Sequence, residues 1–152
     1  MIIIGYDGSP DARAAIKQAG MLMPGYPALV LTVWGPPGPE GVPEPKTVRN
    51  PAEARAVQLA SDGAWLGHQL GIDCRPATRR YRTTVADAIV AEARRADARA
   101  IIVGRGGQPA SGPLGSVSRA VVREAGCAVL VAAADPHGAD SEGDPDRLGA
   151  AA

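Results

Sequence analysis

Short, almost uninterrupted apolar runs alternate along this sequence with longer segments in which apolar residues recur at helical spacing. Four such runs, at residues 1–6, 28–34, 100–103 and 128–132, are interpreted as strands, and residues 72–82 as a weaker fifth strand with Cys74, Ala77 and Tyr81. Only Thr32 is polar in the second run, and a run that is apolar on both faces is typical of a parallel strand covered by helices on both sides. Strands that alternate with helices in this way predict a doubly wound parallel α/β sheet with right-handed crossovers.

Capping signals mark where three of the four expected helices begin. Residues 9–10 and 50–51 each place a capping Ser or Asn before a proline, which is the pattern of a helix N-terminus. Either Thr83 or Thr84 is suited to cap the third helix. In the second helix, Leu59, Leu66 and Leu70 recur with small residues at helical spacing, so we expect all three leucines on its buried face.

Length and charge narrow the class of protein. The chain has 152 residues, 45% of them hydrophobic, and its 16 basic residues balance 16 acidic ones. We therefore expect one α/β domain over residues 1–134 and a flexible tail over residues 135–152, whose composition is polar and glycine-rich. Zero net charge disfavours nucleic acid or an anionic membrane as a partner. No apolar run reaches the ~20 residues of a spanning helix, so we expect a soluble, cytoplasmic protein.

The remaining reactive side chains give little support for catalysis. Cys74 and Cys127 are far apart in the sequence and fall in or beside expected strands, so we interpret both as small buried residues rather than as metal ligands or a disulfide. His68 and His137 have no partners at ligand spacing and are expected at the surface. The charged residues of segment 92–97 are expected on the solvated face of the third helix. We predict a protein that is not an enzyme and holds no structural metal.

Residues 104–116, which follow the fourth expected strand, are the most informative segment. Four glycines precede the Gly115-Ser116 pair at the start of a helix, an arrangement that can direct backbone N–H groups toward a phosphate. The alternative is a surface turn in which Ser116 caps its own helix. The segment lacks the lysine of a P-loop. A dinucleotide-binding motif would follow the first strand, whereas this segment follows the fourth. Residues 7–9 should emerge beside it, since both segments follow the ends of neighbouring strands.

Four short motifs together resemble those of a known family. They are DGS at 7–9, VG at 103–104, GSVS at 115–118 and CAVLV at 127–131. With these motifs, about residues 1–133 resemble the universal stress protein family, which belongs to the adenine nucleotide α-hydrolase-like superfamily. The resemblance implies an open α/β/α sandwich with strand order 3-2-1-4-5 and two helices on each face.

The resemblance also implies a nucleotide site. Asp7 would flank ribose or adenine, and Val33 would face adenine. The alternative for Asp7 is a residue that only stabilises a turn. The residues that would hold the phosphates are Gly104, Gly107, Gly115, Ser116 and Val117. We add Arg105 as a phosphate partner, the alternative being an ordinary exposed arginine.

One departure from the family pattern concerns the length of this segment. ATP-binding members of the family have the pattern G-x2-G-x9-G-S/T, whose glycines correspond to Gly104, Gly107 and Gly115. Here seven residues, 108–114, separate Gly107 from Gly115, two fewer than in that pattern, and they include two prolines, which lack an N–H donor.

We therefore expect a regulatory module of the stress response that binds ATP, with or without Mg²⁺, or a related adenine nucleotide, with little or no turnover. The alternative is a nucleotide-free dimeric interaction protein of the same fold, and slow ATP hydrolysis is a weaker third hypothesis. A homodimer through the fifth strand is expected because residues 128–134 contain no charge or proline to protect an exposed edge.

Overall fold

The computed structural model describes residues 1–35, 50–106 and 112–135. The strands are β1 (Ile2–Gly5), β2 (Ala28–Trp34), β3 (Cys74–Arg80), β4 (Ala100–Gly104) and β5 (Ala128–Ala132). The helices are α1 (Pro10–Leu22), α2 (Pro51–Gln69), α3 (Val85–Arg95) and α4 (Ser116–Glu124). Gly107 and residues 136–152 of the expected tail, which include His137, lie outside the described residues.

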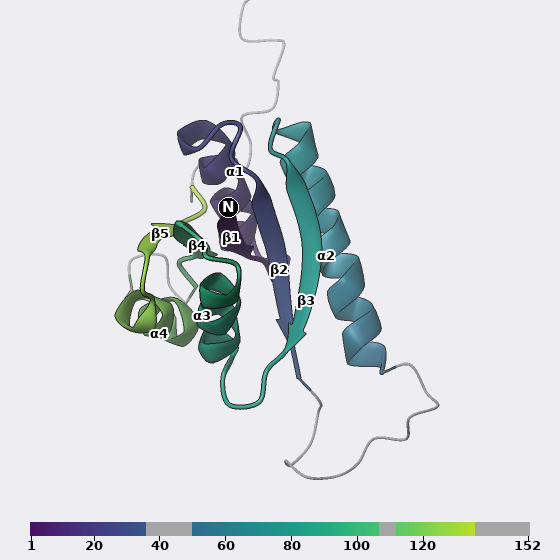
Figure 1. Cartoon of the computed structure of the whole chain (residues 1–152), viewed down its shortest axis with the longest axis vertical. Coiled ribbons are helices and arrows are strands. Elements are labelled where there is room, and N and C mark those ends of the chain that lie inside the picture. Colours follow the sequence, from purple (N-terminus) through teal and green to yellow (C-terminus); the bar gives the residue numbers. More distant parts are fainter. Residues whose placement is uncertain (36–49, 107–111, 136–152) are drawn as a thin grey trace, which may run out of the picture.

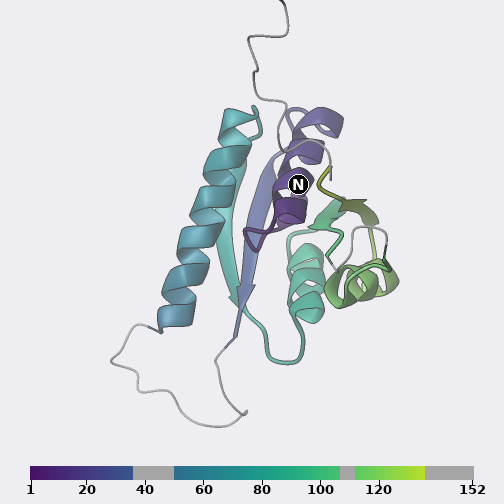
Figure 2. The ribbon, with the colours of Figure 1, turned by 180° about the vertical axis from the view of Figure 1, so that it is seen from behind.

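The five strands form one parallel sheet in the order β3-β2-β1-β4-β5, which confirms the predicted fold class. β1 lies at the centre, and β3 and β5 are the two edges. Figure 1 and the reverse view in Figure 2 show α1 and α2 on one side of the sheet and α3 and α4 on the other. Because all strands point the same way, their carboxyl ends meet along one edge, where the winding reverses beside β1.

Two hydrophobic cores fill the space between the sheet and its two layers of helices. Ile2 and Ile4 of β1 point into the core beneath α1 and α2, whereas Ile3 between them points into the core beneath α3 and α4. All three isoleucines are fully buried, as expected for a central parallel strand. The structure thereby explains why β1 has no polar residue.

Helix α2 packs mainly through small residues, with Leu66 at the margin of the core. Its buried residues are Ala56, Ala60, Gly63, Ala64 and Gly67. A Cβ atom on Gly67 would lie 2.2 Å from the Cys74 sulfur, so helix and strand approach too closely for a larger side chain. The prediction that Leu70 is buried was wrong, because it follows the last turn of α2 and is 41% exposed; Leu59 and Leu66 are only half-buried.

The charged segment of α3 also differs from the prediction. Glu92 was expected in solvent but is 3% exposed, and its carboxylate accepts hydrogen bonds from Arg79 of β3 and from Arg95. Burial raises the pKa of Glu92, but the hydrogen bonds and charges of the two guanidinium groups outweigh it, so the net pKa lies below the ordinary value. The helical pattern alone could not reveal this because Arg79 comes from a strand thirteen residues earlier.

The two cysteines lie in different environments. Cys74 is buried as predicted, and desolvation together with the charge of Asp73 raises the pKa of its thiol to about 11. Cys127 is only half-buried, so the prediction of a buried residue was wrong for this thiol. It precedes the edge strand β5, where one flank of the sheet has no neighbour. His68 is exposed on α2, as predicted.

Within the described ranges, none of the helices is long and apolar enough to cross a membrane.

Candidate nucleotide-binding pocket

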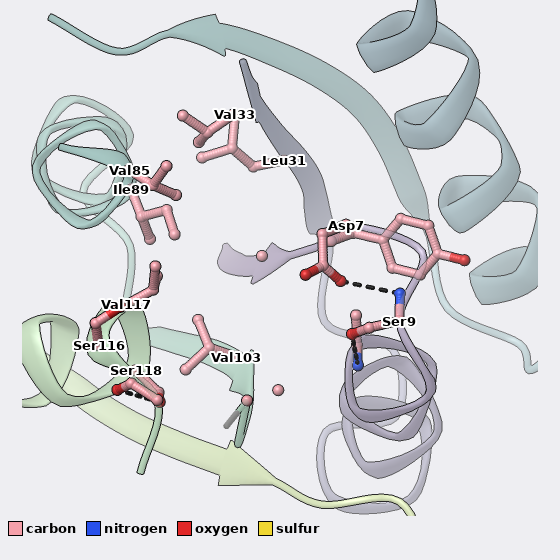
Figure 3. Close-up of a pocket in the computed structure, with 16 residues that line it drawn as sticks. Asp7, Ser9, Leu31, Val33, Val85, Ile89, Val103, Ser116, Val117 and Ser118 are labelled. Carbon is pink, nitrogen blue, oxygen red and sulfur yellow. Dashed lines mark hydrogen bonds between the residues drawn. The ribbon is translucent and has the colours of Figure 1, made fainter. Parts of the chain in front are cut away.

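A pocket of about 240 Å³ opens at the carboxyl ends of β1, β2 and β4. Figure 3 shows the side chains that line it, coming from these strands and from the first turns of α1, α3 and α4. The residues that form its apolar wall are Leu31, Val33, Val85, Ile89, Val103 and Val117. The polar residues are Asp7, Ser9, Ser116 and Ser118, and the rest of the lining is Gly5, Tyr6, Ala12, Gly104, Gly106 and Gly115. The pocket therefore joins an apolar wall to two separate polar ends, which is the usual composition of a small-molecule site.

Asp7 forms the polar end that follows β1. It is exposed, and its Oδ1 accepts a hydrogen bond from the backbone N–H of Ser9 at 2.9 Å. The Ser9 hydroxyl in turn accepts from the N–H of Ala12 at 3.2 Å and so caps α1, as predicted. Asp7 consequently forms a turn and lines the pocket at the same time, and the two interpretations of this residue do not exclude each other. An ionised carboxylate accepts hydrogen bonds only, so this end suits hydroxyl or amino groups.

The first turn of α4 forms the opposite polar end, across the pocket from Asp7 (Figure 3). Its N-cap is Gly115, and no side chain caps it, unlike Ser9, Asn50 and Thr84 at the other three helices. Ser116 lies inside the helix as its first residue, so the alternative in which Ser116 caps its own helix is not what the structure shows.

The backbone donors of this turn remain available. The N–H groups of residues 116–118 have no hydrogen-bond partner within the described residues, whereas that of Gly115 donates to the carbonyl oxygen of Arg105 at 3.1 Å. Open donors at the positive end of a helix dipole favour an anion.

Six of the eight predicted site residues line this one pocket. They are Asp7, Val33, Gly104, Gly115, Ser116 and Val117. Arg105 is not among the lining residues, and its guanidinium donates to the carbonyl oxygen of Gly112. Gly107, the eighth, lies outside the described residues. Arg119, which was expected to be exposed, is so, and it donates to the carbonyl oxygen of Leu114 at 2.8 Å.

Gly104 has a structural reason to be glycine that the sequence did not reveal. A Cβ atom at this position would lie 2.8 Å from the carbonyl carbon of Asp11 and 2.9 Å from the backbone nitrogen of Ala12. Both atoms belong to the backbone of α1, which therefore rests directly on the end of β4. The lack of a side chain at Gly104 is thus required by helix packing, whatever else it allows in the pocket.

Sequence reasoning missed several parts of this site. Val85 and Ile89 were assigned to the core beneath α3, but they also face the pocket, because α3 begins at its rim. Ser118 was not singled out, although it is 2% exposed and its hydroxyl donates to the Arg105 carbonyl oxygen at 2.6 Å. The signal for Val85 and Ile89 was their position in the first turns of a helix that follows a strand end.

The chain is an open, doubly wound α/β domain with a pocket at its switch point, which is where α/β domains of this class bind small ligands. Within that class, residues 1–133 match the family described as "Universal stress protein family", and the chain belongs to this family. No curated protein sequence matches the chain.

Solved structures of universal stress proteins share the fold. One from Archaeoglobus fulgidus, in complex with dAMP, is 22% identical with a TM-score of 0.65, and the match covers 86% of this chain and 95% of that chain. One from Arabidopsis thaliana with AMP bound is 18% identical with a TM-score of 0.67, covering 93% and 95%. Another, in complex with cAMP, is 21% identical with a TM-score of 0.68, covering 88% and 97%.

Proposed function

We propose that this protein binds an adenine nucleotide in the pocket between Asp7 and the start of α4, and that it acts as a cytoplasmic regulatory module of the stress response with little or no turnover. The observation that carries the proposal is the uncapped N-terminus of α4, which faces Asp7 across an apolar wall. The complexes of family members with dAMP, AMP and cAMP support the choice of an adenine nucleotide.

The chemistry of the lining gives the ligand one favoured orientation. The base would pack against Val33 and Val85, which offer no polar atoms from their side chains. Ribose hydroxyls would donate to Asp7, and the phosphate would accept from the open N–H groups of residues 116–118. The reverse orientation would bring a phosphate against the Asp7 carboxylate, where like charges repel.

The pocket is small, and its described lining has few groups that could catalyse a reaction. Its volume of about 240 Å³ lies below the roughly 300–1,000 Å³ of sites for drug-sized ligands, so a nucleotide bound there would extend beyond it. Asp7 is the one carboxylate among the described lining residues, and the described residues contain no group of three His, Cys, Asp or Glu side chains that could hold a metal. If ATP binds with Mg²⁺ in the favoured orientation, the phosphates and water would hold the ion, because Asp7 lies at the opposite, ribose end of the pocket.

Isothermal titration calorimetry with AMP, and with ATP in the presence and absence of Mg²⁺, tests the proposal. Gly115→Val places a branched side chain at the helix entrance and should weaken binding about tenfold or more, because it obstructs the approach of phosphate to the backbone donors. Arg119→Ala is the matched control in the next turn and should change affinity by less than about threefold, because this side chain is exposed and bonds Leu114. Equal losses, with both variants folded by circular dichroism, would move the phosphate site elsewhere. No binding at millimolar nucleotide would favour the nucleotide-free interaction protein.

We propose in addition that the chain forms a homodimer through β5. The two sheet edges differ sharply: β3 carries Arg75, Pro76, Arg79 and Arg80, which protect an edge, whereas β5 reads AVLVA. Ala128 is exposed and the next three residues of β5 are only half-buried, and among the described residues β5 pairs with β4 alone, so a second copy would find apolar side chains and a free strand edge there.

Multi-angle light scattering at micromolar concentration tests the dimer. The wild type should have the mass of two chains, and Ala128→Lys should shift it toward one chain, because it places a charge on the proposed interface. Val57→Lys, at a half-exposed site on α2, is the matched control and should leave the mass unchanged. A monomeric wild type would refute the dimer without touching the nucleotide proposal.

A further inference from the structure

Asp11, in the first turn of α1, links two segments that lie far apart in the sequence. Its Oδ2 accepts a hydrogen bond from the N–H of Gly106 at 3.0 Å, and its Oδ1 accepts from the N–H of Ala134 at 2.8 Å. Gly106 lies near the start of the glycine-rich segment, residues 104–116, and has a left-handed φ of 61°. Ala134 lies two residues beyond β5, at the point where the chain leaves the sheet. One carboxylate therefore holds both the entrance of the glycine-rich segment and the exit of the edge strand.

Arg105, the residue just before Gly106, connects the same hydrogen-bond network to α4. The N–H of Arg105 donates to the carbonyl oxygen of Ala132 at 2.6 Å. The carbonyl oxygen of Arg105 accepts from the N–H of Gly115 at 3.1 Å and from the hydroxyl of Ser118 at 2.6 Å. The end of β5, residues 105–106 and the first turn of α4 are thus joined by consecutive hydrogen bonds.

We propose that Asp11 is a positioning residue for the nucleotide site, and that through Asp11 the affinity for nucleotide depends on the backbone just after β5. This inference rests on the proposed nucleotide binding. Asp11 does not line the pocket, so it acts through Gly106 and the Arg105 peptide, which fix where the first turn of α4 and its open donors lie.

The helix dipole alone does not account for the geometry of Asp11. An acidic residue in the first turn of a helix interacts favourably with the helix dipole, and Asp11 shares this property with Glu53 of α2 and Asp87 of α3. Neither of those two side chains has a hydrogen bond to a distant segment among the described residues. Asp11, in contrast, accepts from Gly106 and Ala134, which are separated from it in the sequence by 95 and 123 positions. The dipole interaction therefore explains the charge but not the two contacts.

The first arm of the test measures nucleotide affinity at a temperature where every variant is fully folded. Asp11→Asn keeps the shape of the side chain but replaces one acceptor oxygen with an NH₂ group, and it should weaken AMP binding about tenfold, since hydrogen bonds to charged groups are among the stronger ones. Glu53→Gln is the matched control, because it removes an exposed charge from the first turn of α2, and its affinity should stay within about twofold of wild type. A merely structural role for Asp11 would lower the melting temperature and leave the dissociation constant unchanged.

The second arm perturbs the far end of the link. Ala134→Pro removes the N–H that donates to Asp11, outside both the strand and the pocket lining, and it should weaken AMP binding about threefold or more. The double variant Asp11→Asn/Ala134→Pro should lose less affinity than the product of the two single losses, because both changes break the same link. Unchanged affinity in Ala134→Pro, or full multiplicativity, would refute the dependence on the β5 exit.

A third measurement separates failure of this inference from failure of nucleotide binding itself. Amide hydrogen exchange of the ligand-free protein should show slow exchange at Gly106 and Ala134, and faster exchange at one or both of them in Asp11→Asn, since the amide side chain keeps a single, uncharged oxygen for two N–H donors. If the wild type binds AMP but Asp11→Asn binds equally well, the positioning role is refuted while the proposed function stands. If the wild type binds no adenine nucleotide, the proposed function fails and the positioning role fails with it, even where the amide pattern is as expected.

Discussion

The close approach of α1 to β4 at Gly104 makes one substitution especially informative. Gly104→Ala would place a Cβ atom 2.8 Å from the Asp11 carbonyl carbon and 2.9 Å from the Ala12 nitrogen, both of them backbone atoms that no change of rotamer can move. The N-terminus of α1 must therefore shift by a few tenths of an ångström, and overpacking of this kind costs about 1–3 kcal/mol. For a domain of this size, that loss lowers the melting temperature by roughly 4–12 °C.

Differential scanning calorimetry with a matched glycine variant measures this cost. Gly126→Ala is the control, because Gly126 does not have a positive φ and a Cβ atom there would meet nothing within 4 Å; its stability should change by less than about 0.5 kcal/mol. If Gly104→Ala has the melting temperature of the wild type but no longer binds nucleotide, the steric argument is wrong and this glycine is needed for contact with the phosphates. A loss of stability in Gly104→Ala alone supports the packing role.

Two further predictions concern buried ionisable groups. In native protein at pH 8, a thiol reagent should label Cys127 and leave Cys74 unlabelled until the chain unfolds, because burial holds the Cys74 pKa near 11 and about one thiol in a thousand is ionised; labelling of both cysteines at one rate would contradict this. Because the folded-state pKa of Glu92 lies below its value in the unfolded chain, its contribution to stability is present above about pH 4.5 and is lost as the pH falls through the folded pKa. Urea titrations should therefore show Glu92→Gln about 1–3 kcal/mol less stable at pH 7, with a shallower loss toward acid than the wild type, and parallel pH profiles would refute the role of this carboxylate.

The strand and helix pattern was predictable because it depends on local signals. A run such as residues 28–34, apolar on both faces, has few alternatives to a buried parallel strand, and capped starts such as Ser9-Pro10 fix where helices begin. What local patterns could not supply was partner identity. Glu92 is buried because Arg79 reaches it from another element, and Leu70 is exposed because α2 ends just before it.

The candidate site was predictable in outline for a related reason. Parallel strands deliver residues 7–9 and 104–106 to one edge of the sheet, so two separated segments point to one pocket. Its detailed chemistry depends on which backbone donors are already used, and this is a property of the folded chain. The N–H of Gly115 is paired with Arg105, whereas those of the next three residues have no partner among the described residues, and no sequence motif distinguishes the two cases.

The shortened glycine-rich segment has a limited effect on this architecture, because its two ends are held independently of its length. At one end, residues 104–106 are fixed by the close contact of Gly104 with α1 and by the Asp11 carboxylate. At the other end, Gly115 donates to the Arg105 carbonyl oxygen, so the segment returns to the place where it began. Closing a loop that is two residues shorter changes its entropy by only about 0.2 kcal/mol. The shorter spacing is therefore compatible with the observed position of the first turn of α4, which is why our proposal places the phosphate at that turn.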